Sequence, residues 1–320
     1  MTTILDLGIQ LVLAIQSLGG WLELPMKLLS FLGTEEFFMF VLPLVYWCLD
    51  SRLGIRIAFI LMLSIGINGA LKLVFHGPRP YWYSPDVKGL GSEASFGAPS
   101  GHSQNSFALW GMLAVWLKKW WAWLAMGLLV FLIGISRLYL GVHFPHDVLL
   151  GWLVGGLLLW LVVKFWDPVA ARLKRMSFGG QVLIALVASL LLILVMFIPY
   201  FWLYFSSWKP DPAWASFATN ATSLEGAVSS GGTLFGLGLG LAWMARLGGF
   251  KTSGTWWQLL LRILVGLAGV LIIRYGLKYI FTEGETVLAY TLRYLRYALI
   301  GAWVAGGAPW TFIRMKLAEK

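Results

Sequence analysis

The sequence predicts an all-α bundle of membrane-spanning helices, and three observations support this fold class. Hydrophobic residues make up 59% of the 320-residue chain and charged residues only 12%, which leaves too little polar surface to cover a water-soluble globule. The mean hydropathy is +0.78. The apolar residues also fall into long runs separated by short polar connections. We therefore expect a polytopic integral membrane protein with about nine or ten spans.

The apolar segments can be placed in order along the chain. Residues 3–18 and 21–32 alternate apolar and polar positions at helical spacing, and Gly19-Gly20 and Pro25 interrupt them. These two segments either lie in the membrane interface or make a short span. Clearer spans follow Glu35 and Glu36. We expect them at residues 36–49, 54–75, 103–120, 121–138, 147–166, 178–205, 229–245, 255–275 and 285–307.

The net charge of +10 indicates membrane orientation and not binding to nucleic acid, because the basic residues form short clusters between apolar runs. The clusters fall at alternate ends of successive spans, at residues 50–56, 118–119, 172–175, 246–251 and 314–320. The positive-inside rule makes that side cytoplasmic. Segments 76–102, 137–146, 206–228 and 276–285 then face the periplasm, the exterior or a lumen, and we expect a multi-pass protein of the plasma or inner membrane.

Three polar segments lie on this predicted non-cytoplasmic side. In the first, Lys72 to Pro80, a helix ends at Gly77-Pro78 and an arginine follows. In the second, Pro99-Ser100-Gly101-His102, a helix begins, and its free N–H groups and dipole favour an anion. The third runs from Ser136 to Asp147; an arginine ends one span, and a histidine and an aspartate lead into the next. Taken singly, such residues are better explained by a helix cap or by a lysine that reaches the interface.

Together the three segments fit the chemistry of a phosphoryl group. Arginine offers a planar fork for phosphate oxygens, lysine a point charge, and helix amides further donors. One histidine can attack phosphorus while a carboxylate fixes its tautomer, and another histidine can protonate the leaving oxygen. This chemistry requires no metal ion, and the single cysteine, Cys48, excludes a cysteine-rich metal site.

The motifs Lys72-x6-Arg79-Pro80, Pro99-Ser100-Gly101-His102 and Ser136-Arg137-x5-His143-x3-Asp147 resemble the three-part signature of the type-2 phosphatidic-acid phosphatase superfamily. Every position of the signature is filled and the spacings agree. The resemblance covers about residues 36–166 and implies a phosphatase core of the six-helix type. We expect this core at residues 1–167 and additional transmembrane helices of unknown role at residues 168–320.

The resemblance implies a role for each matching residue. His143 is then the nucleophile that forms a phosphohistidine, Asp147 orients it, and His102 is the general acid for the leaving group. The residues implied to hold the phosphoryl oxygens are Lys72, Arg79, Ser100, Gly101 and Arg137. His76 and His146 match no catalytic position and are interpreted as interfacial or supporting residues.

The expected activity is hydrolysis of a lipid phosphate or pyrophosphate, without cofactor or metal ion, and the expected partners are that substrate and membrane lipids. Candidate substrates are phosphatidic acid, phosphatidylglycerol phosphate, undecaprenyl pyrophosphate and sphingoid-base phosphates. Two alternatives stay open: a lipid phosphotransferase that uses the same phosphohistidine, and a lipid transporter on the same fold. A haloperoxidase is disfavoured because those relatives are soluble.

The C-terminal spans carry two further patterns. The run from Gly236 to Gly240, with glycine at every second position, follows no strand, so helix packing is favoured over a dinucleotide-binding loop. Several basic residues also lie in or near the last two spans, where a charge needs a cavity or a partner; they are Arg262, Arg274, Lys278, Arg293 and Arg296, with Glu283 and Glu285 as candidate partners.

Overall fold

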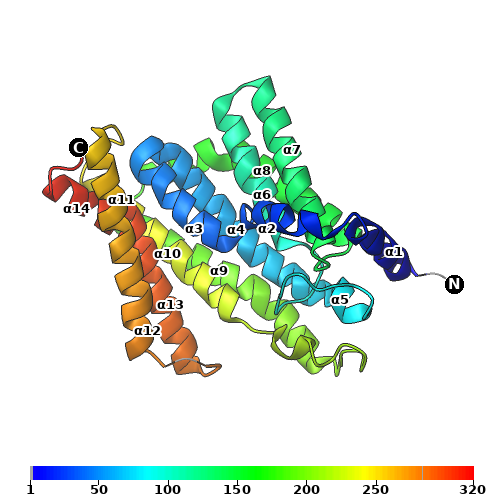
Figure 1. Cartoon of the computed structure of the whole chain (residues 1–320). Coiled ribbons are helices and arrows are strands. Elements are labelled where there is room, and N and C mark those ends of the chain that lie inside the picture. The colour runs from blue at the N-terminus through cyan, green and yellow to red at the C-terminus, as the bar shows by residue number, and fades with distance from the viewer. Residues whose placement is uncertain (1–2, 283) are drawn as a thin grey trace. The chain divides into compact units, whose positions relative to one another are not determined.

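The computed structural model describes residues 3–282 and 284–320, and every regular element in them is helical (Figure 1). The α-helices are α1 (Ile4–Gln16), α2 (Glu23–Phe31), α3 (Glu35–Leu44), α4 (Ser51–Phe75), α5 (Pro80–Tyr83), α6 (Gly101–Leu117), α7 (Trp120–Tyr139), α8 (Pro145–Lys174), α9 (Phe178–Phe205), α10 (Glu225–Arg246), α11 (Trp256–Leu271), α12 (Leu277–Ile280), α13 (Val287–Ala302) and α14 (Ala308–Arg314). Short 3-10 turns occur at Gly20–Leu22 and Ala218–Asn220, and π-helical segments at Val45–Leu49, Ile272–Gly276 and Trp303–Gly307. The all-α class predicted from the sequence is confirmed.

In the described residues, six helical stretches are long and apolar enough to cross a membrane: Ser51–Tyr83, Trp120–Tyr139, Pro145–Lys174, Phe178–Phe205, Glu225–Arg246 and Trp256–Ile280. The expected count of nine or ten is not confirmed. Three of the expected spans form helices that are too short to qualify. Helix α6 has 17 residues and α13 has 16, while α3 has 10 before it passes into a π-helical segment.

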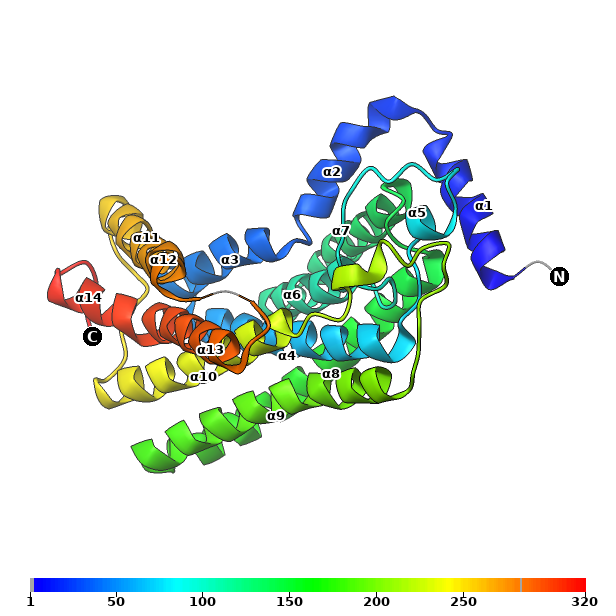
Figure 2. The same ribbon diagram turned by 90° about the horizontal axis from the view of Figure 1, so that it is seen from below.

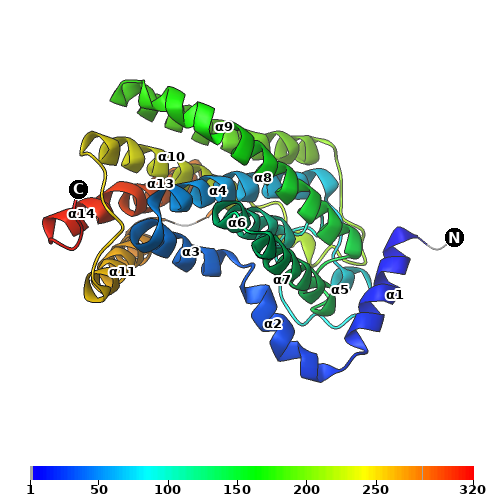
Figure 3. The ribbon, with the colours of Figure 1, turned by 90° about the horizontal axis from the view of Figure 1, so that it is seen from above.

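The two N-terminal segments, for which the sequence allowed either a place in the membrane interface or a short span, form a bent pair of helices. The stretches Ile4–Gln16 and Gly20–Phe31 meet at 88° (Figure 3), and together they count as a seventh span only if the bend is one broken span. Gly19 makes the bend with a φ of 112°, a backbone conformation that glycine adopts without steric cost.

The chain divides into two compact units. The first consists of Met1–Phe38, Ile67–Leu161 and Met196–Ser223, and the second of Met39–Gly66, Val162–Val195 and Leu224–Lys320. Both units are therefore discontinuous in sequence. The boundary expected after residue 167 stays a prediction.

In the first unit, glycines bring α8 against the beginning of α6. A Cβ atom on Gly151 would lie 2.6 Å from the Ser100 carbonyl oxygen, and one on Gly155 would lie 2.5 Å from the Gln104 carbonyl oxygen. Small residues four apart let helix backbones approach closely. Helix α7 also packs on α6 (Figure 3).

In the second unit, α10 and α13 pack side by side (Figure 2). Cβ atoms on Gly232 and Gly236 would lie 2.5 Å and 1.9 Å from the carbonyl oxygens of Tyr294 and Ala298. The sequence-based interpretation of the glycine run as a helix-packing surface is confirmed.

The basic residues of the second unit have structural partners. Arg262 is fully buried, and each of its described hydrogen bonds goes to a backbone carbonyl oxygen. Arg293 pairs with Glu225 at 2.5 Å, a carboxylate that the sequence analysis did not consider. Glu283 lies outside the described residues.

Replacing Gly236 by alanine tests the packing of α10 on α13. The added Cβ would overlap the Ala298 carbonyl oxygen, so we expect the free energy of unfolding to fall by about 1–3 kcal/mol. The midpoint of thermal unfolding in detergent measures this change. Gly179→Ala is the matched control, because nothing lies within 4 Å of a Cβ there. Equal midpoints for the two variants would contradict the packing.

Candidate active site

The ends of four helices in the first unit bring the predicted polar residues together. Lys72 lies in the last turn of α4, Ser100 caps α6, and Arg137 lies in the last turn of α7. His143 lies in the connection to α8, whose first turn carries Asp147. The Ser100 N–H donates to the Asp147 carbonyl oxygen at 2.9 Å, so the second and third motifs are joined by a backbone hydrogen bond.

His143 and Asp147 form a buried pair, each with only 1% of the side chain exposed. The His143 Nδ1 lies 3.2 Å from Asp147 Oδ2, and that oxygen also accepts from the Phe144 N–H at 2.9 Å. A carboxylate on Nδ1 fixes the tautomer in which Nδ1 carries the proton. Nε2 then presents a lone pair, and it lies 3.2 Å from Arg79 Nη1.

Burial lowers the pKa of His143 well below its ordinary value, and the charges of Arg79 and Lys72 lower it further. The imidazole is therefore neutral at physiological pH. A neutral ring with a proton on Nδ1 has the nucleophilic form of Nε2.

Backbone carbonyls hold Lys72 and Arg79 in place. Lys72 Nζ donates to the Phe96 carbonyl oxygen at 2.5 Å. Arg79 donates through Nε to the Ser95 carbonyl oxygen at 2.7 Å and through Nη1 to that of Val142 at 2.8 Å. Arg79 is fully buried, so its guanidinium has a fixed orientation beside the ring of His143.

Arg137 is the third cation, and only 5% of its side chain is exposed. It donates to the Ser30 hydroxyl through Nη1 and to Glu93 through Nη2. Its Nε is buried and has no hydrogen-bond partner within residues 3–282 and 284–320. A buried donor without an acceptor is costly, and a phosphoryl oxygen is the kind of acceptor that such a donor needs.

The beginning of α6 forms the remaining wall. The Ser100 side chain accepts from the Ser103 N–H at 3.3 Å, which makes it the helix cap that the sequence indicated. Asn68 supports this turn by donating to the Pro99 carbonyl oxygen at 3.2 Å and to Gln104 Oε1 at 2.9 Å. A Cβ on Gly101 would lie 3.1 Å from Asn68 Oδ1, so a larger residue would disturb the turn.

Glu93 is part of this cluster, and the sequence analysis missed it. Its carboxylate contacts Arg137 and lies 3.8 Å from Arg79 Nη2 and 4.0 Å from His102 Nδ1. Burial alone would raise the pKa of Glu93, but the guanidinium groups of Arg137 and Arg79 outweigh it and lower the pKa to about 2. The sequence offered one signal for Glu93: it is one of two acidic residues, with Asp86, in the polar connection of residues 84–100.

The two histidines outside the motifs lie at the edge of the cluster. His146 Nε2 lies 3.3 Å from Asp147 Oδ1, and its ring stacks on Phe144. The ring of His76 packs against Trp208, with 4.9 Å between centroids. Trp208 belongs to the connection before α10 and also contacts Phe96, whose carbonyl holds two of the cations.

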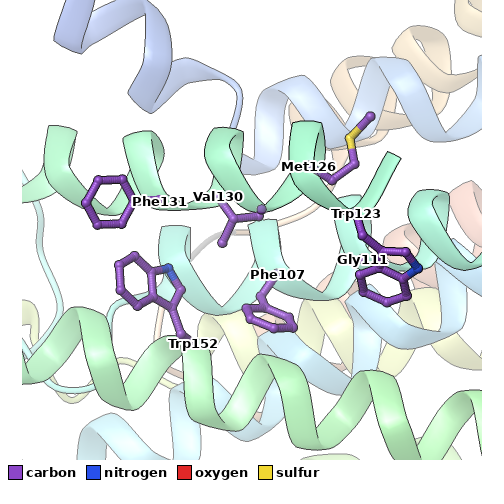
Figure 4. A pocket seen from close by; sticks show the side chains of 8 residues that line it. Phe107, Gly111, Trp123, Met126, Val130, Phe131 and Trp152 are labelled. Carbon is purple, nitrogen blue, oxygen red and sulfur yellow. The ribbon is translucent and has the colours of Figure 1, made fainter. Parts of the chain in front are cut away.

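A groove of about 190 Å³ lies between α6, α7 and α8 in the same unit (Figure 4). It is lined by Phe107, Gly111, Trp123, Met126, Gly127, Val130, Phe131 and Trp152. Phe107 and Trp152 each follow a motif residue, His102 and Asp147, by five positions, which is about 7.5 Å along a helix. The three helices that carry the second and third motifs therefore also form an apolar groove further along their lengths.

Two sequence profiles match the chain. Residues 53–170 match the PAP2 superfamily, and residues 228–320 match the transmembrane extension of PAP2 superfamily phosphatases. The first match contains all three motifs.

Individual proteins and a solved structure are also similar. Phosphatidylglycerophosphatase B of Bacillus subtilis (strain 168) is 32% identical over 167 residues, which are 48% of this chain and 80% of that protein. Human glucose-6-phosphatase 3 is 28% identical over 213 residues, 58% of this chain, and the match spans 60% of the relative's length. The crystal structure of a transmembrane PAP2 type phosphatidylglycerolphosphate phosphatase from Bacillus subtilis has a TM-score of 0.45 and 28% identity, covering 51% of this chain and 86% of that chain.

The profile across the motifs, the profile across the C-terminal helices and the similarity over most of the bacterial relative agree with one another. The chain belongs to the PAP2 superfamily of membrane phosphatases.

Proposed function

We propose that the protein hydrolyses a lipid phosphate or pyrophosphate through a phosphohistidine on His143. The observation that carries this proposal is the buried pair of His143 and Asp147, with the Nε2 of the histidine 3.2 Å from Arg79 Nη1. Candidate substrates are phosphatidic acid, phosphatidylglycerol phosphate, undecaprenyl pyrophosphate and sphingoid-base phosphates. No step of the proposed reaction needs a metal ion.

In the first step, His143 Nε2 attacks phosphorus and the bond from phosphorus to the leaving oxygen breaks. The electron pair of that bond goes to the leaving oxygen, which takes a proton from His102. Asp147 stabilises the positive charge on the phosphorylated ring. In the second step, a water gives one proton to His102 and its oxygen bonds to phosphorus while the bond from phosphorus to His143 Nε2 breaks. The electron pair of that bond returns to Nε2, which releases phosphate and restores His143.

The cations stabilise the charge on the equatorial oxygens in both steps. Arg79 and Lys72 are fixed by carbonyls before substrate arrives, so they need little reorganisation during the reaction. Arg137 supplies a donor whose Nε still lacks an acceptor among the described residues. At the beginning of α6, Ser100 offers its hydroxyl and Gly101 its backbone N–H to the same oxygens.

We place this site on the non-cytoplasmic side of the membrane. Lys118 and Lys119 lie at the other end of α6 from His102, about 24 Å away along the helix. The positive-inside rule assigns the lysine end to the cytoplasm. The plasma or inner membrane is the proposed location.

The groove supports a lipid substrate over a soluble sugar phosphate. Its lining is apolar and it begins about one and a half turns below the motif residues, so a hydrocarbon chain can occupy it while the phosphate lies at His143. Its volume of about 190 Å³ is below the roughly 300–1,000 Å³ of pockets for drug-sized ligands, which suits a single chain.

Replacing His143 by alanine removes the nucleophile. We expect release of phosphate from lipid phosphates by the detergent-solubilised protein to fall by at least about 10³-fold. His146→Ala is the comparison, because the His146 ring contacts the other carboxylate oxygen of Asp147, Oδ1. This variant should keep most of the activity. Equal losses in the two variants would show that the nucleophile is wrongly assigned.

Chelators and vanadate test the metal-free mechanism. Activity should survive EDTA, and vanadate should inhibit because it mimics pentacoordinate phosphorus. Acceptor lipids added to the same assay should remain unphosphorylated if water is the acceptor. Loss of activity in EDTA that added divalent metal restores would contradict the mechanism, and phosphorylated acceptor would identify a phosphotransferase.

Replacing Gly127 by phenylalanine tests the groove. No atom lies within 4 Å of a Cβ at this position, so the ring can enter the groove without displacing the backbone. We expect KM for a long-chain lipid phosphate to rise about tenfold, the loss of roughly two buried methylene groups, and KM for p-nitrophenyl phosphate to stay constant. Gly179→Phe, at an equally open position outside the groove lining, is the control. A parallel rise for both substrates would exclude the groove as the tail site.

A further inference from the structure

The two histidines of the site have similar surroundings at Nδ1. Asp147 Oδ2 lies 3.2 Å from Nδ1 of His143, and Glu93 Oε1 lies 4.0 Å from Nδ1 of His102. In both rings a carboxylate lies on the Nδ1 side, which leaves Nε2 for the reacting group. The motif signature accounts for Asp147 and contains no residue that corresponds to Glu93.

We infer that Glu93 is a positioning residue that holds His102 in the orientation and the protonated form needed to protonate the leaving oxygen. This inference rests on the proposed phosphatase function. Glu93 itself touches neither phosphorus nor the leaving group. It faces the Nδ1–H of the His102 imidazolium, and the second proton of the ring, on Nε2, is the one that is transferred. When the bond from phosphorus to oxygen breaks, the leaving oxygen takes this proton, and water returns one to Nε2 in the second step.

The backbone around Glu93 is fixed, which supports a permanent role for its carboxylate. The Tyr81 hydroxyl donates to the Glu93 carbonyl oxygen and accepts from the Glu93 N–H, both at 3.3 Å. Two residues further on, the Ser95 carbonyl oxygen accepts from buried Arg79. The carboxylate therefore cannot withdraw far when substrate binds.

The charge of Glu93 also matters to His102. The other charged neighbours of His102 include the cations Arg137, Arg79 and Lys72, located at the ends of α7 and α4 and just before α5. Cations and burial disfavour an imidazolium, and a carboxylate favours it. Burial and these cations lower the pKa of His102 well below its ordinary value, and Glu93 opposes that shift. Without Glu93 the protonated ring would be rarer still near neutral pH.

The separation of 4.0 Å is longer than a hydrogen bond, and Oε1 is engaged with Arg137. Catalytic hydrogen bonds often shorten only in the complex with substrate.

Glu93→Gln in the full-length protein tests the inference, with two substrates compared by kcat/KM. An alkoxide leaves poorly without a proton, whereas p-nitrophenolate needs none at neutral pH. We expect kcat/KM for a lipid phosphate to fall about 10- to 100-fold, within the range of general acid catalysis, and that for p-nitrophenyl phosphate to change less than about threefold. The alkaline limb of the pH profile for the lipid should move to lower pH.

A double variant separates positioning from structural support. Because Glu93 acts through His102, adding Glu93→Gln to His102→Ala should cause no further loss. Asp86→Asn removes an exposed carboxylate from the same connection and should leave both substrates unaffected. Glu93→Gln also removes the carboxylate that pairs with Arg137, so the midpoint of thermal unfolding should fall; activities are therefore compared below the lower midpoint.

Three outcomes would overturn the inference. They are equal losses on both substrates, a further loss in the His102→Ala background, and higher activity of Glu93→Gln with tighter vanadate inhibition. The last would make Glu93 an anion that competes with phosphate. A wild-type protein that releases no phosphate from either substrate would instead overturn the proposed function itself.

Discussion

The site depends on burying three cations within a few ångströms of one another at the ends of membrane helices. Lys72, Arg79 and Arg137 are each at most 9% exposed. Moving a charge out of water costs several kcal/mol even after relaxation, and like charges add repulsion. The fold must therefore supply negative charge and acceptors around these three side chains before any substrate arrives.

Most of that compensation comes from one connection, residues 84–100. The carbonyls of Ser95 and Phe96 accept from the first two cations, and the carboxylate of Glu93 pairs with Arg137. A phosphoryl group entering the cluster adds negative charge where positive charge is in excess. The same feature that makes the empty site costly thus gives it affinity for a dianion.

Close packing of α6 and α8 turns these local contacts into one site. The glycines of α8 let its first turn approach the beginning of α6, and the hydrogen bond from Ser100 to the Asp147 carbonyl oxygen fixes their register. A bulkier residue at Gly151 would separate Ser100 from Asp147. The positions of Asp147 and of the beginning of α6 are therefore set by the same backbone contact.

The sequence predicted the parts of the site whose geometry is local. A histidine just before a helix and an aspartate in the first turn of that helix lie four residues apart and can meet, and a serine before an apolar run is a helix cap; both were foreseen. Glu93 was not, because its contacts depend on the irregular path of a connection that has no periodic pattern. The count of nine or ten spans is not confirmed. For two of the expected spans, π-helical segments interrupt the α-helices at places where the hydropathy continues.

Burial of a cation alone does not mark a functional residue, and Arg262 in the second unit shows why. It is fully buried, and its described hydrogen bonds go to the carbonyl oxygens of Leu317, Trp47, Thr252 and Ser253. Backbone carbonyl oxygens accept the described hydrogen bonds of this guanidinium, so Arg262 stabilises the fold of the second unit. Arg79 differs because one of its nitrogens faces the ring of a histidine, and Arg137 differs because it pairs with a carboxylate and keeps a donor without a described acceptor. What distinguishes a site from a structural charge is the chemistry of the partner and the donor that remains unused.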